Sequence, residues 1–243
     1  MLLNIKMNTM QVEIWSDIMC PFCYIGKRRF EKAMASFKDA GEVEVIWKSF
    51  QLDPNQEDLP GKSINEYLAE RKGWTVDYAR EMNKYVTDMA AGEGLVYDMD
   101  KAVVANSFNA HRLIQMAKKA GLGDAAEEAL FFAYFTEGKN INDDQTLIQI
   151  GVSIGLDEQA IREMLDSGVY VNDVRAEAQE AGMLGARGVP FFVFNRKYAI
   201  SGAQATEAFT QVLNTAFADW KLSQVRKIEV VNDGDVCAVD GDC

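Results

Sequence analysis

The stretch VEIWSDIMCPFC, residues 12–23, decides the fold of this chain. Residues 12–15 alternate apolar and polar side chains, which predicts a first β-strand. Pro21 suits the first position of a helix because its missing N–H would be unpaired there, and we expect this helix to run to about Ala40. A second strand-like segment at 43–47 completes a βαβ unit, in which the two strands are parallel.

A long helical block follows this unit. A connector over 51–61 leads into residues 63–184, which have helical patterning and little strand signal. The predicted helices cover 64–72, 76–91, 101–120, 125–137, 144–154, 158–165 and 171–181. Strands return as a hairpin with arms at 191–194 and 198–200, and residues 206–224 predict a final amphipathic helix.

The order of elements is therefore βαβ, a block of helices, then ββα. The two parts of the sheet must meet in order to bury their apolar strands. We predict an α/β fold in which one domain, made of 10–60 and 185–226, is split by an all-helical insertion at 61–184. Residues 227–243 are short, acidic and contain glycine, which predicts a flexible tail.

Composition and charge exclude several classes of function. The 243 residues are 48% hydrophobic, enough to bury a sizeable core, and their net charge of −12 disfavours nucleic acid and anionic membrane surfaces as partners. No segment approaches the roughly 18 uninterrupted apolar residues of a membrane span, and the first residues lack the pattern of a signal peptide. We therefore expect a cytoplasmic protein.

The four cysteines form two close pairs, Cys20/Cys23 and Cys237/Cys243. In a reducing compartment such pairs indicate redox chemistry or metal binding rather than a structural disulfide framework. The free N–H groups and the dipole at a helix N-terminus favour a thiolate, so we expect Cys20 to be an exposed nucleophile and Cys23 an inward-facing resolving thiol. A zinc site, which needs four ligands, and a pair of inert core thiols are the alternatives.

Further motifs along the chain give the first cysteine pair a context. They are WSD at 15–17, CPFCYIGKR at 20–28, FQLDP at 50–54, NSFNAHR at 106–112, GARGVPFF at 185–192 and ISGAQ at 200–204. In this order the set resembles the thioredoxin superfamily, and more closely its DsbA-like branch, which includes the FrnE-like cytosolic proteins. The resemblance implies a thioredoxin-like domain around the predicted helical insertion.

The resemblance also implies a second half of the site at Val189 and Pro190. It implies a cis peptide bond beside the Cys20 sulfur, which leaves the Val189 backbone free to pair with an extended substrate. A trans proline that opens a strand is the alternative. Phe22 carries no charge or side-chain donor, so we predict that the pKa of Cys20 is less depressed than in the most oxidising DsbA-type proteins. We expect Phe22 to contact substrate as well.

The proton acceptor for Cys23 is left open by the sequence. Related proteins carry a buried acid on the strand before the motif, but the aligned position here is Ile14. Asp17 or a water molecule is then the candidate, with a surface-loop role for Asp17 as the alternative. The resemblance places His111 near the cysteines, where it would lower the thiol pKa or bind substrate; a purely structural histidine is the alternative.

The second cysteine pair allows three interpretations. Cys237 and Cys243 could form a second redox pair whose disulfide exchanges with Cys20, or they could be incidental thiols in an acidic tail. A divalent ion held by the neighbouring aspartates is the third, although their spacing is too short for an EF-hand loop.

We predict a thiol–disulfide oxidoreductase or isomerase that acts on a disulfide- or dithiol-containing protein or small molecule. It has no bound cofactor or metal, with glutathione as an optional co-substrate and a homodimer as an option. The alternative is a glutathione-dependent enzyme like the 2-hydroxychromene-2-carboxylate isomerases and kappa-class transferases, which share the split fold but usually carry a serine or a single thiol at the Cys20 position. A metal- or partner-binding module is the third hypothesis.

Overall fold

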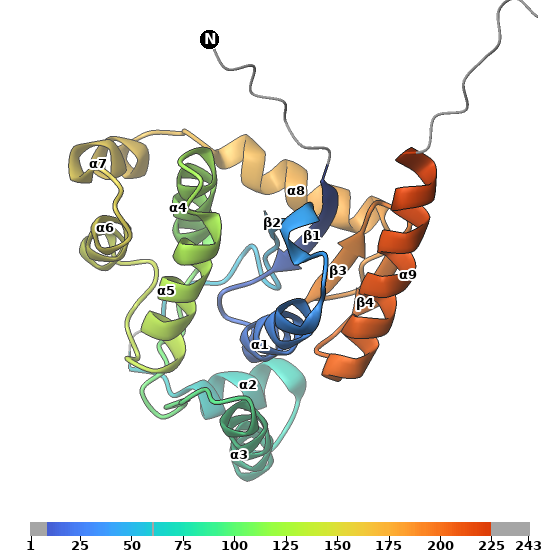
Figure 1. Cartoon of the computed structure of the whole chain (residues 1–243). Coiled ribbons are helices and arrows are strands. Elements are labelled where there is room, and N and C mark those ends of the chain that lie inside the picture. Colours follow the sequence, from blue (N-terminus) through green and yellow to red (C-terminus); the bar gives the residue numbers. More distant parts are fainter. Residues whose placement is uncertain (1–8, 60, 225–243) are drawn as a thin grey trace, which may run out of the picture.

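The computed structural model describes residues 9–59 and 61–224 (Figure 1). Within them a mixed sheet has the strand order β2-β1-β3-β4. Its strands are β1 (Met10–Ser16), β2 (Val43–Ser49), β3 (Phe191–Phe194) and β4 (Tyr198–Ser201). β1 lies in the middle, parallel to β2 and antiparallel to β3, so the strand before the cysteines joins the two halves of the sheet.

Successive side chains of β1 point to opposite faces of the sheet, and helices cover both faces. Ile14 packs with α1 (Pro21–Ser36) and α9 (Thr206–Gln224), whose aromatic rings meet those of β3. The Phe192 and Phe209 rings, for example, lie 4.7 Å apart and nearly perpendicular. Trp15 points to the opposite face and packs there with Ala181 of α8 (Val171–Met183). The period of two along β1 therefore gives each face its own cover.

The chain between β2 and β3 is helical. It contains α2 (Ile64–Lys72), α3 (Val76–Gly92), α4 (Phe108–Lys119), α5 (Gly123–Phe135), α6 (Asp144–Ser153), α7 (Glu158–Asp166) and α8. Most of these helices lie to one side of the sheet and α1, whereas α8 crosses the sheet (Figure 1). The fold is thus the predicted α/β fold of the thioredoxin type with a helical insertion. The predicted domain boundaries at 60/61 and 184/185 stay a prediction. α8 belongs to the predicted insertion, since it ends before the boundary at 184/185, yet it packs against the sheet.

Two predicted helix boundaries are wrong. Residues 101–107 are not helical, because their backbone pairs with the connector instead: Leu59 N–H donates to Val104 O at 2.9 Å, and Asn106 N–H donates to Asp58 Oδ1 at 2.8 Å. The first helix ends at Ser36 rather than near Ala40, because the next residue is extended and a separate 3₁₀ turn follows at Ala40–Glu42.

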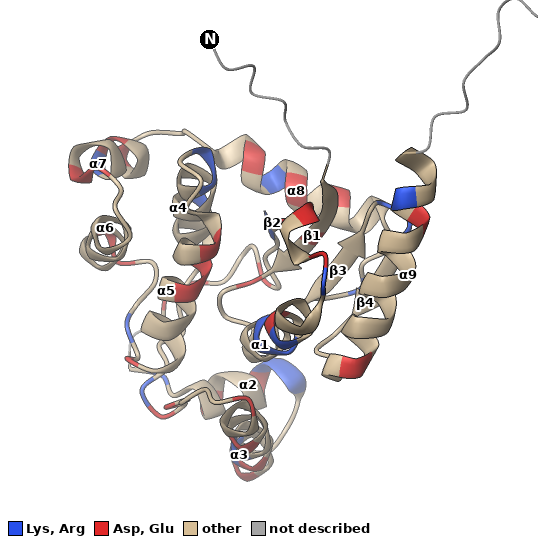
Figure 2. Ribbon diagram, viewed as in Figure 1, with Lys and Arg blue, Asp and Glu red and all other residues tan. Residues whose placement is uncertain are grey.

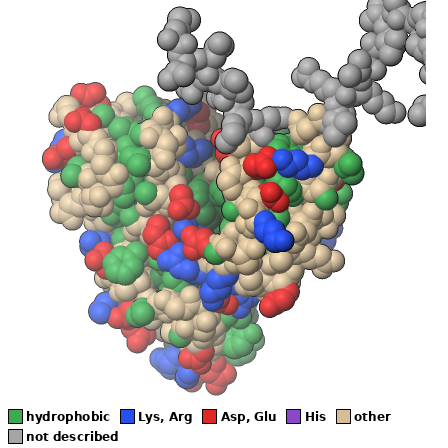
Figure 3. Space-filling view, viewed as in Figure 1, with side chains coloured by type: hydrophobic (Ala, Val, Ile, Leu, Met, Phe, Trp, Pro, Cys, Tyr) green, Lys and Arg blue, Asp and Glu red, His purple; other side chains and the backbone are tan. Residues whose placement is uncertain are grey.

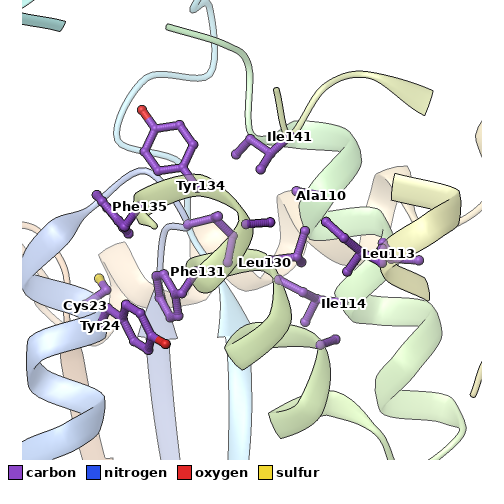
Figure 4. Close-up of a cluster of buried hydrophobic side chains, with 14 of the residues drawn as sticks. Cys23, Tyr24, Ala110, Leu113, Ile114, Leu130, Phe131, Tyr134, Phe135 and Ile141 are labelled. Atoms are coloured by element: carbon purple, nitrogen blue, oxygen red, sulfur yellow. The ribbon is translucent and has the colours of Figure 1, made fainter. Parts of the chain in front are cut away.

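An aromatic core joins the insertion to α1. Tyr24, next to Cys23, stacks on Phe131 of α5 with ring centroids 4.8 Å apart, and Phe135 follows one turn later (Figure 4). Cys20 and Cys23 belong to the same buried cluster as these rings. The insertion therefore packs directly against the cysteine motif rather than standing apart from it.

Charged groups reinforce the junction between α1 and α5. The Lys27 side chain is 2% exposed, and its Nζ lies 3.2 Å from Asp124 and 3.1 Å from Glu128 of α5. Burial alone would raise the pKa of Glu128, but hydrogen bonds from Arg28 and Tyr24 outweigh it and lower the pKa to about 2. Figure 2 shows basic and acidic residues on α1 and acidic residues on α5. In Figure 3, charged side chains of both signs gather in the middle of the face.

Candidate active site

Cys20 lies at the N-terminus of α1, where the sequence places it. It is the N-cap residue, with an extended backbone (φ −92°, ψ 110°), and Pro21 opens the helix. The Cys23 N–H donates to Cys20 O at 2.9 Å, which fixes the first turn between the two residues. Both cysteines are free thiols. The unpaired N–H groups of this first turn and the helix dipole favour negative charge beside Cys20.

The expectation that Cys20 is exposed is wrong. Its exposed fraction is 4%, close to the 1% of Cys23. The cover comes from residues distant in sequence, since Cys20 belongs to the core cluster that the insertion completes and its Sγ lies 3.6 Å from Val189 O. Access to the sulfur therefore depends on the cavity described below.

The two thiols differ in their surroundings. Burial raises the pKa of Cys23 well above its ordinary value, and its hydrogen bond with Cys20 and the charge of that neighbour raise it further. Cys23 thus keeps its proton at neutral pH, which leaves Cys20 as the candidate nucleophile. The predicted pKa of Cys20, relative to oxidising relatives, stays a prediction.

Val189 and Pro190 reach the cysteines from the C-terminal half of the chain. The peptide bond between them is cis, the geometry that the resemblance implied. The Cys20 Sγ is a donor to the Val189 carbonyl, and Pro190 precedes β3 directly. Pro190 also rests on α1, because a Cβ added at Gly26 would lie 3.1 Å from its Cγ. The lack of a side chain at Gly26 therefore lets this loop approach the cysteine helix.

Asp17 is a buried residue, so its interpretation as a surface-loop aspartate is wrong. It is 2% exposed, and its carboxylate accepts the Leu52 N–H at 2.7 Å and the Met19 N–H at 3.3 Å. His111 lies behind it, with Nε2 3.4 Å from Asp17 Oδ1 and no exposed surface. Neither ring nitrogen of His111 has a hydrogen-bond partner among the described residues, and its role in the site stays a prediction. Asp17 holds the loop that leads into Cys20.

Ile14 stands on β1 where related proteins carry an acid, and the buried acids near the sheet lie at other positions. Ile14 is completely buried among apolar side chains, as its position on the α1 face requires. Glu13 is 2% exposed, but it pairs with Arg196 and with Lys48. Glu127 of α5 is also fully buried, and neither of its carboxyl oxygens has a hydrogen-bond partner among the described residues. Burial raises the pKa of Glu127 to about 8, partly offset by Lys27.

Tyr97 is a contact of the motif that the sequence did not predict. Its hydroxyl donates to Pro21 O at 2.8 Å, and its ring stacks on Phe135 with centroids 4.5 Å apart. Burial, followed by the charge of Cys20, raises its pKa, so the hydroxyl stays a donor. Tyr97 lies in the irregular segment between α3 and α4 and belongs to no motif, so no local signal points to it.

A cavity of about 330 Å³ opens beside Cys20. Cys20, Pro21 and Phe22 line it, and Phe22 is 37% exposed. The walls come mainly from α2, α3, the end of α5 and the connector after β2. They include Met19, Leu52, Ile64, Tyr67, Leu68, Trp74, Met82, Val86, Met99, Ala102, Tyr134 and Phe135. The cavity is therefore a largely apolar space that reaches the candidate nucleophile.

The described residues, 9–59 and 61–224, contain neither a candidate metal cluster nor a helix that could span a membrane. Over these ranges no group of three or more His, Cys, Asp or Glu side chains is placed to hold a metal ion. No helix within them is both long enough and apolar enough to cross a bilayer. Cys237 and Cys243 lie outside the described residues.

Known proteins resemble this chain over most of its length. The DSBA-like thioredoxin domain family matches residues 11–214. One similar structure is the crystal structure of a probable DsbA oxidoreductase from Streptomyces coelicolor, which is 38% identical in sequence. The match covers 96% of this chain and 98% of the Streptomyces chain, with a TM-score of 0.81. The uncharacterized protein YwbO of Bacillus subtilis is 27% identical and covers 85% of this chain and 96% of its own.

A 2-hydroxychromene-2-carboxylate isomerase is similar in fold alone. It is 14% identical, covers 90% of this chain and 100% of its own, and gives a TM-score of 0.62. That likeness is expected, because one split fold serves several chemistries and the site distinguishes them.

Proposed function

Since this chain belongs to the DSBA-like thioredoxin domain family, we propose that it is a thiol–disulfide oxidoreductase or isomerase whose redox pair is Cys20 and Cys23. One observation carries the proposal: Cys20 caps the N-terminus of α1 beside the Val189–Pro190 loop, with a second, buried thiol one turn away. Within the family, the quoted motifs favour the FrnE-like branch.

The reaction that we propose is an exchange through a mixed disulfide. The Cys20 thiolate attacks a substrate disulfide, forms a Cys20–substrate bond and releases the other substrate sulfur as a thiolate, which takes up a proton. Cys23 then loses its proton and attacks the Cys20 sulfur. This step releases the second substrate thiol and leaves a Cys20–Cys23 disulfide. The substrate gains two electrons and the protein loses two; the reverse sequence oxidises a substrate dithiol.

Substrate binding in this proposal uses the Val189–Pro190 loop. An extended substrate chain can pair with the Val189 backbone and so bring its sulfur to Cys20. The 3.6 Å distance between the Val189 carbonyl oxygen and the Cys20 Sγ supports this proposal. The partner is therefore a protein or small molecule that carries a disulfide or a dithiol.

The alternative is a glutathione-dependent isomerase or transferase. The likeness to the carboxylate isomerase favours it, but that likeness is one of fold at 14% identity. The complete pair Cys20 and Cys23 favours the oxidoreductase, because the alternative chemistry has no use for a resolving thiol.

A redox titration tests the proposal. The full chain is equilibrated in glutathione buffers of graded ratio, and the Cys20–Cys23 couple is followed by thiol alkylation and peptide mass analysis. We expect a two-electron transition that Cys20→Ser and Cys23→Ser both abolish. Its midpoint gives the direction of reaction, since about 30 mV corresponds to about 1.4 kcal/mol. Absence of a reversible couple, or glutathione binding without disulfide turnover, contradicts the proposal and favours the isomerase.

The same titration tests the second cysteine pair. We propose that Cys237 and Cys243 exchange with Cys20, and we expect the double variant Cys237→Ser/Cys243→Ser to shift the midpoint of the first pair. An unchanged midpoint means that the two pairs do not communicate.

A further inference from the structure

Arg29 of α1 connects three parts of the chain that are distant in sequence. Its Nη1 donates to the Ala203 carbonyl oxygen at 2.6 Å, and its Nε donates to Glu93 Oε1, also at 2.6 Å. Ala203 lies in the loop after β4, and Glu93 is the C-cap residue of α3 in the insertion. One guanidinium group therefore joins the cysteine helix, the loop after β4 and the helical insertion.

The loop after β4 in turn binds Pro190. The Gly202 N–H donates to the Pro190 carbonyl oxygen at 2.8 Å. Because Gly202 and Ala203 are adjacent, the bond from Arg29 to Ala203 also restrains the N–H group that holds Pro190. Arg29 therefore acts on the Val189–Pro190 loop through a single intervening turn of the chain.

The contacts with both loops lie along one side of α1. Phe22, Gly26 and Arg29 have the i, i+4, i+7 spacing of one helix face. Pro190 rests on this face at Gly26, where an added Cβ would lie 3.1 Å from its Cγ. Ala203 is held at Arg29, one turn further from the cysteines. The same face of the helix that carries the cysteine motif thus supports the substrate loop at two points.

The surroundings of Arg29 fix the direction of its donors. The side chains of Arg29 and Glu93 are only 19% and 14% exposed. Burial alone would raise the pKa of Glu93, but hydrogen bonds from Lys32 and Arg29 outweigh it and lower the pKa, so the carboxylate is charged at neutral pH. A carboxylate paired with Nε leaves Nη1 aimed at Ala203. A lysine ammonium lacks this planar fork and cannot make both bonds in the same geometry.

We propose that Arg29 is a positioning residue for substrate binding: it holds the Val189–Pro190 loop where an extended substrate chain pairs with it, and Glu93 orients its guanidinium group. The inference rests on the proposed function and adds a role for the insertion, since Glu93 caps α3. The bonds of Arg29 go to Ala203 and Glu93 rather than to either sulfur. Its loss should therefore weaken the reaction of polypeptide disulfides more than that of disulfides without a peptide backbone.

Two disulfides test this inference on the reduced full chain. The symmetric disulfide of the peptide Gly-Ser-Ala-Cys-Ala-Ser-Gly can pair with the Val189 backbone, whereas bis(2-hydroxyethyl) disulfide has no peptide groups to do so. Each reaction oxidises the Cys20/Cys23 dithiol and reduces one substrate disulfide to two thiols, and its rate constant is followed by rapid alkylation and mass analysis. The quantity compared between variants is the ratio of the peptide rate constant to that of the small disulfide.

We expect Arg29→Met to lower this ratio by about tenfold or more. A hydrogen bond from a charged donor shifts a local equilibrium by at least about this factor, and the apparent affinity for the chain falls with the fraction of loops in the binding position. Arg29→Lys keeps the positive charge beside Glu93 but loses the bond to Ala203, so it should lower the ratio as well. This variant also decides the matter if Arg29→Met does not fold.

Lys32→Met is the matched control. The Lys32 ammonium pairs with the second oxygen of the Glu93 carboxylate, so Lys32→Met removes the same charge as Arg29→Met without removing a bond to Ala203. We expect it to keep the wild-type ratio. Hydrogen exchange of the Gly202 N–H, followed by NMR, gives a readout that does not depend on activity. This proton should exchange faster in both Arg29 variants and at the wild-type rate in Lys32→Met.

The outcomes separate this inference from the proposed function. If both rate constants fall equally in the Arg29 variants, or if Lys32→Met lowers the ratio as much as Arg29→Met does, the positioning role is overturned and the oxidoreductase stands. Unchanged exchange of the Gly202 N–H in the Arg29 variants also overturns the role, because the loop is then held without Arg29. Failure of the wild type to reduce either disulfide overturns the proposed function, and this role with it.

Discussion

Replacing Glu127 by glutamine should change how the stability of the protein depends on pH. Glu127 is completely buried, neither carboxyl oxygen has a hydrogen-bond partner in the described residues, and burial raises its pKa from 4.5 to about 8. The folded protein therefore holds this proton up to a higher pH than the unfolded chain does. Stability from this group is complete below about pH 4.5 and is lost as the pH rises towards 8.

The magnitude follows from the two pKa values. Each pH unit between them costs the folded state ~1.4 kcal/mol, because the unfolded chain has released the proton and the folded protein has not. Between pH 5 and pH 8 the wild type should lose about 3–4 kcal/mol through Glu127 alone. Glutamine has nearly the same shape and does not titrate, so Glu127→Gln should escape this loss.

Urea unfolding of the reduced protein at pH 5, 6, 7 and 8 measures the effect. The free energy of unfolding of Glu127→Gln, relative to wild type, should rise steadily over this range by about 3–4 kcal/mol. Glu207→Gln on the exposed side of α9 is the control and should follow the wild-type profile. Parallel profiles for wild type and Glu127→Gln would show that Glu127 is ionised in the folded protein, against the reasoning from burial.

Three further predictions concern stability. Phe131→Ala should cost about 3–5 kcal/mol in denaturant unfolding because Phe131 is fully buried, whereas the neighbouring Phe132→Ala, at 47% exposure, should cost far less; equal costs contradict the packing in Figure 4. Tyr97→Phe should cost about 1 kcal/mol, since it removes the hydrogen bond to Pro21 O, and no change in unfolding would mean that this bond contributes nothing. Gly138→Ala should lower stability by about 2–5 kcal/mol, because φ is +67° and the added Cβ would lie 2.7 Å from a backbone oxygen; thermal unfolding like that of wild type argues against this geometry.

The elements set by local patterns could be predicted from the sequence. β1 and α1 follow from alternation and from the proline after Cys20, and both are found. The segment 101–107 has helical patterning, yet its backbone hydrogen bonds go to Asp58 and Leu59, more than forty residues earlier. The pattern within one segment does not reveal such distant partners. Helical propensity alone therefore predicts a helix that begins too early, at residue 101.

The site shows the same division. Cys20, Cys23 and Pro190 lie in motifs whose residue types are tied to their chemistry, and the structure brings them together. The burial of Cys20 arises from the insertion packed against it, and the contact of Tyr97 with the motif arises from an irregular segment. Both depend on tertiary packing, which no spacing within the sequence records.

The central place of β1 has a consequence for synthesis of the chain on the ribosome. β1 ends at Ser16 and its second partner, β3, begins at Phe191, so the 174 residues from 17 to 190 separate them. At 5–20 residues per second, the nascent chain spends on the order of 10–35 s with one edge of β1 unpaired. During that interval Cys20 also lacks the cover of Val189. The earliest strand to leave the ribosome is thus among the last to be completed, and chaperones have that interval in which to shield it.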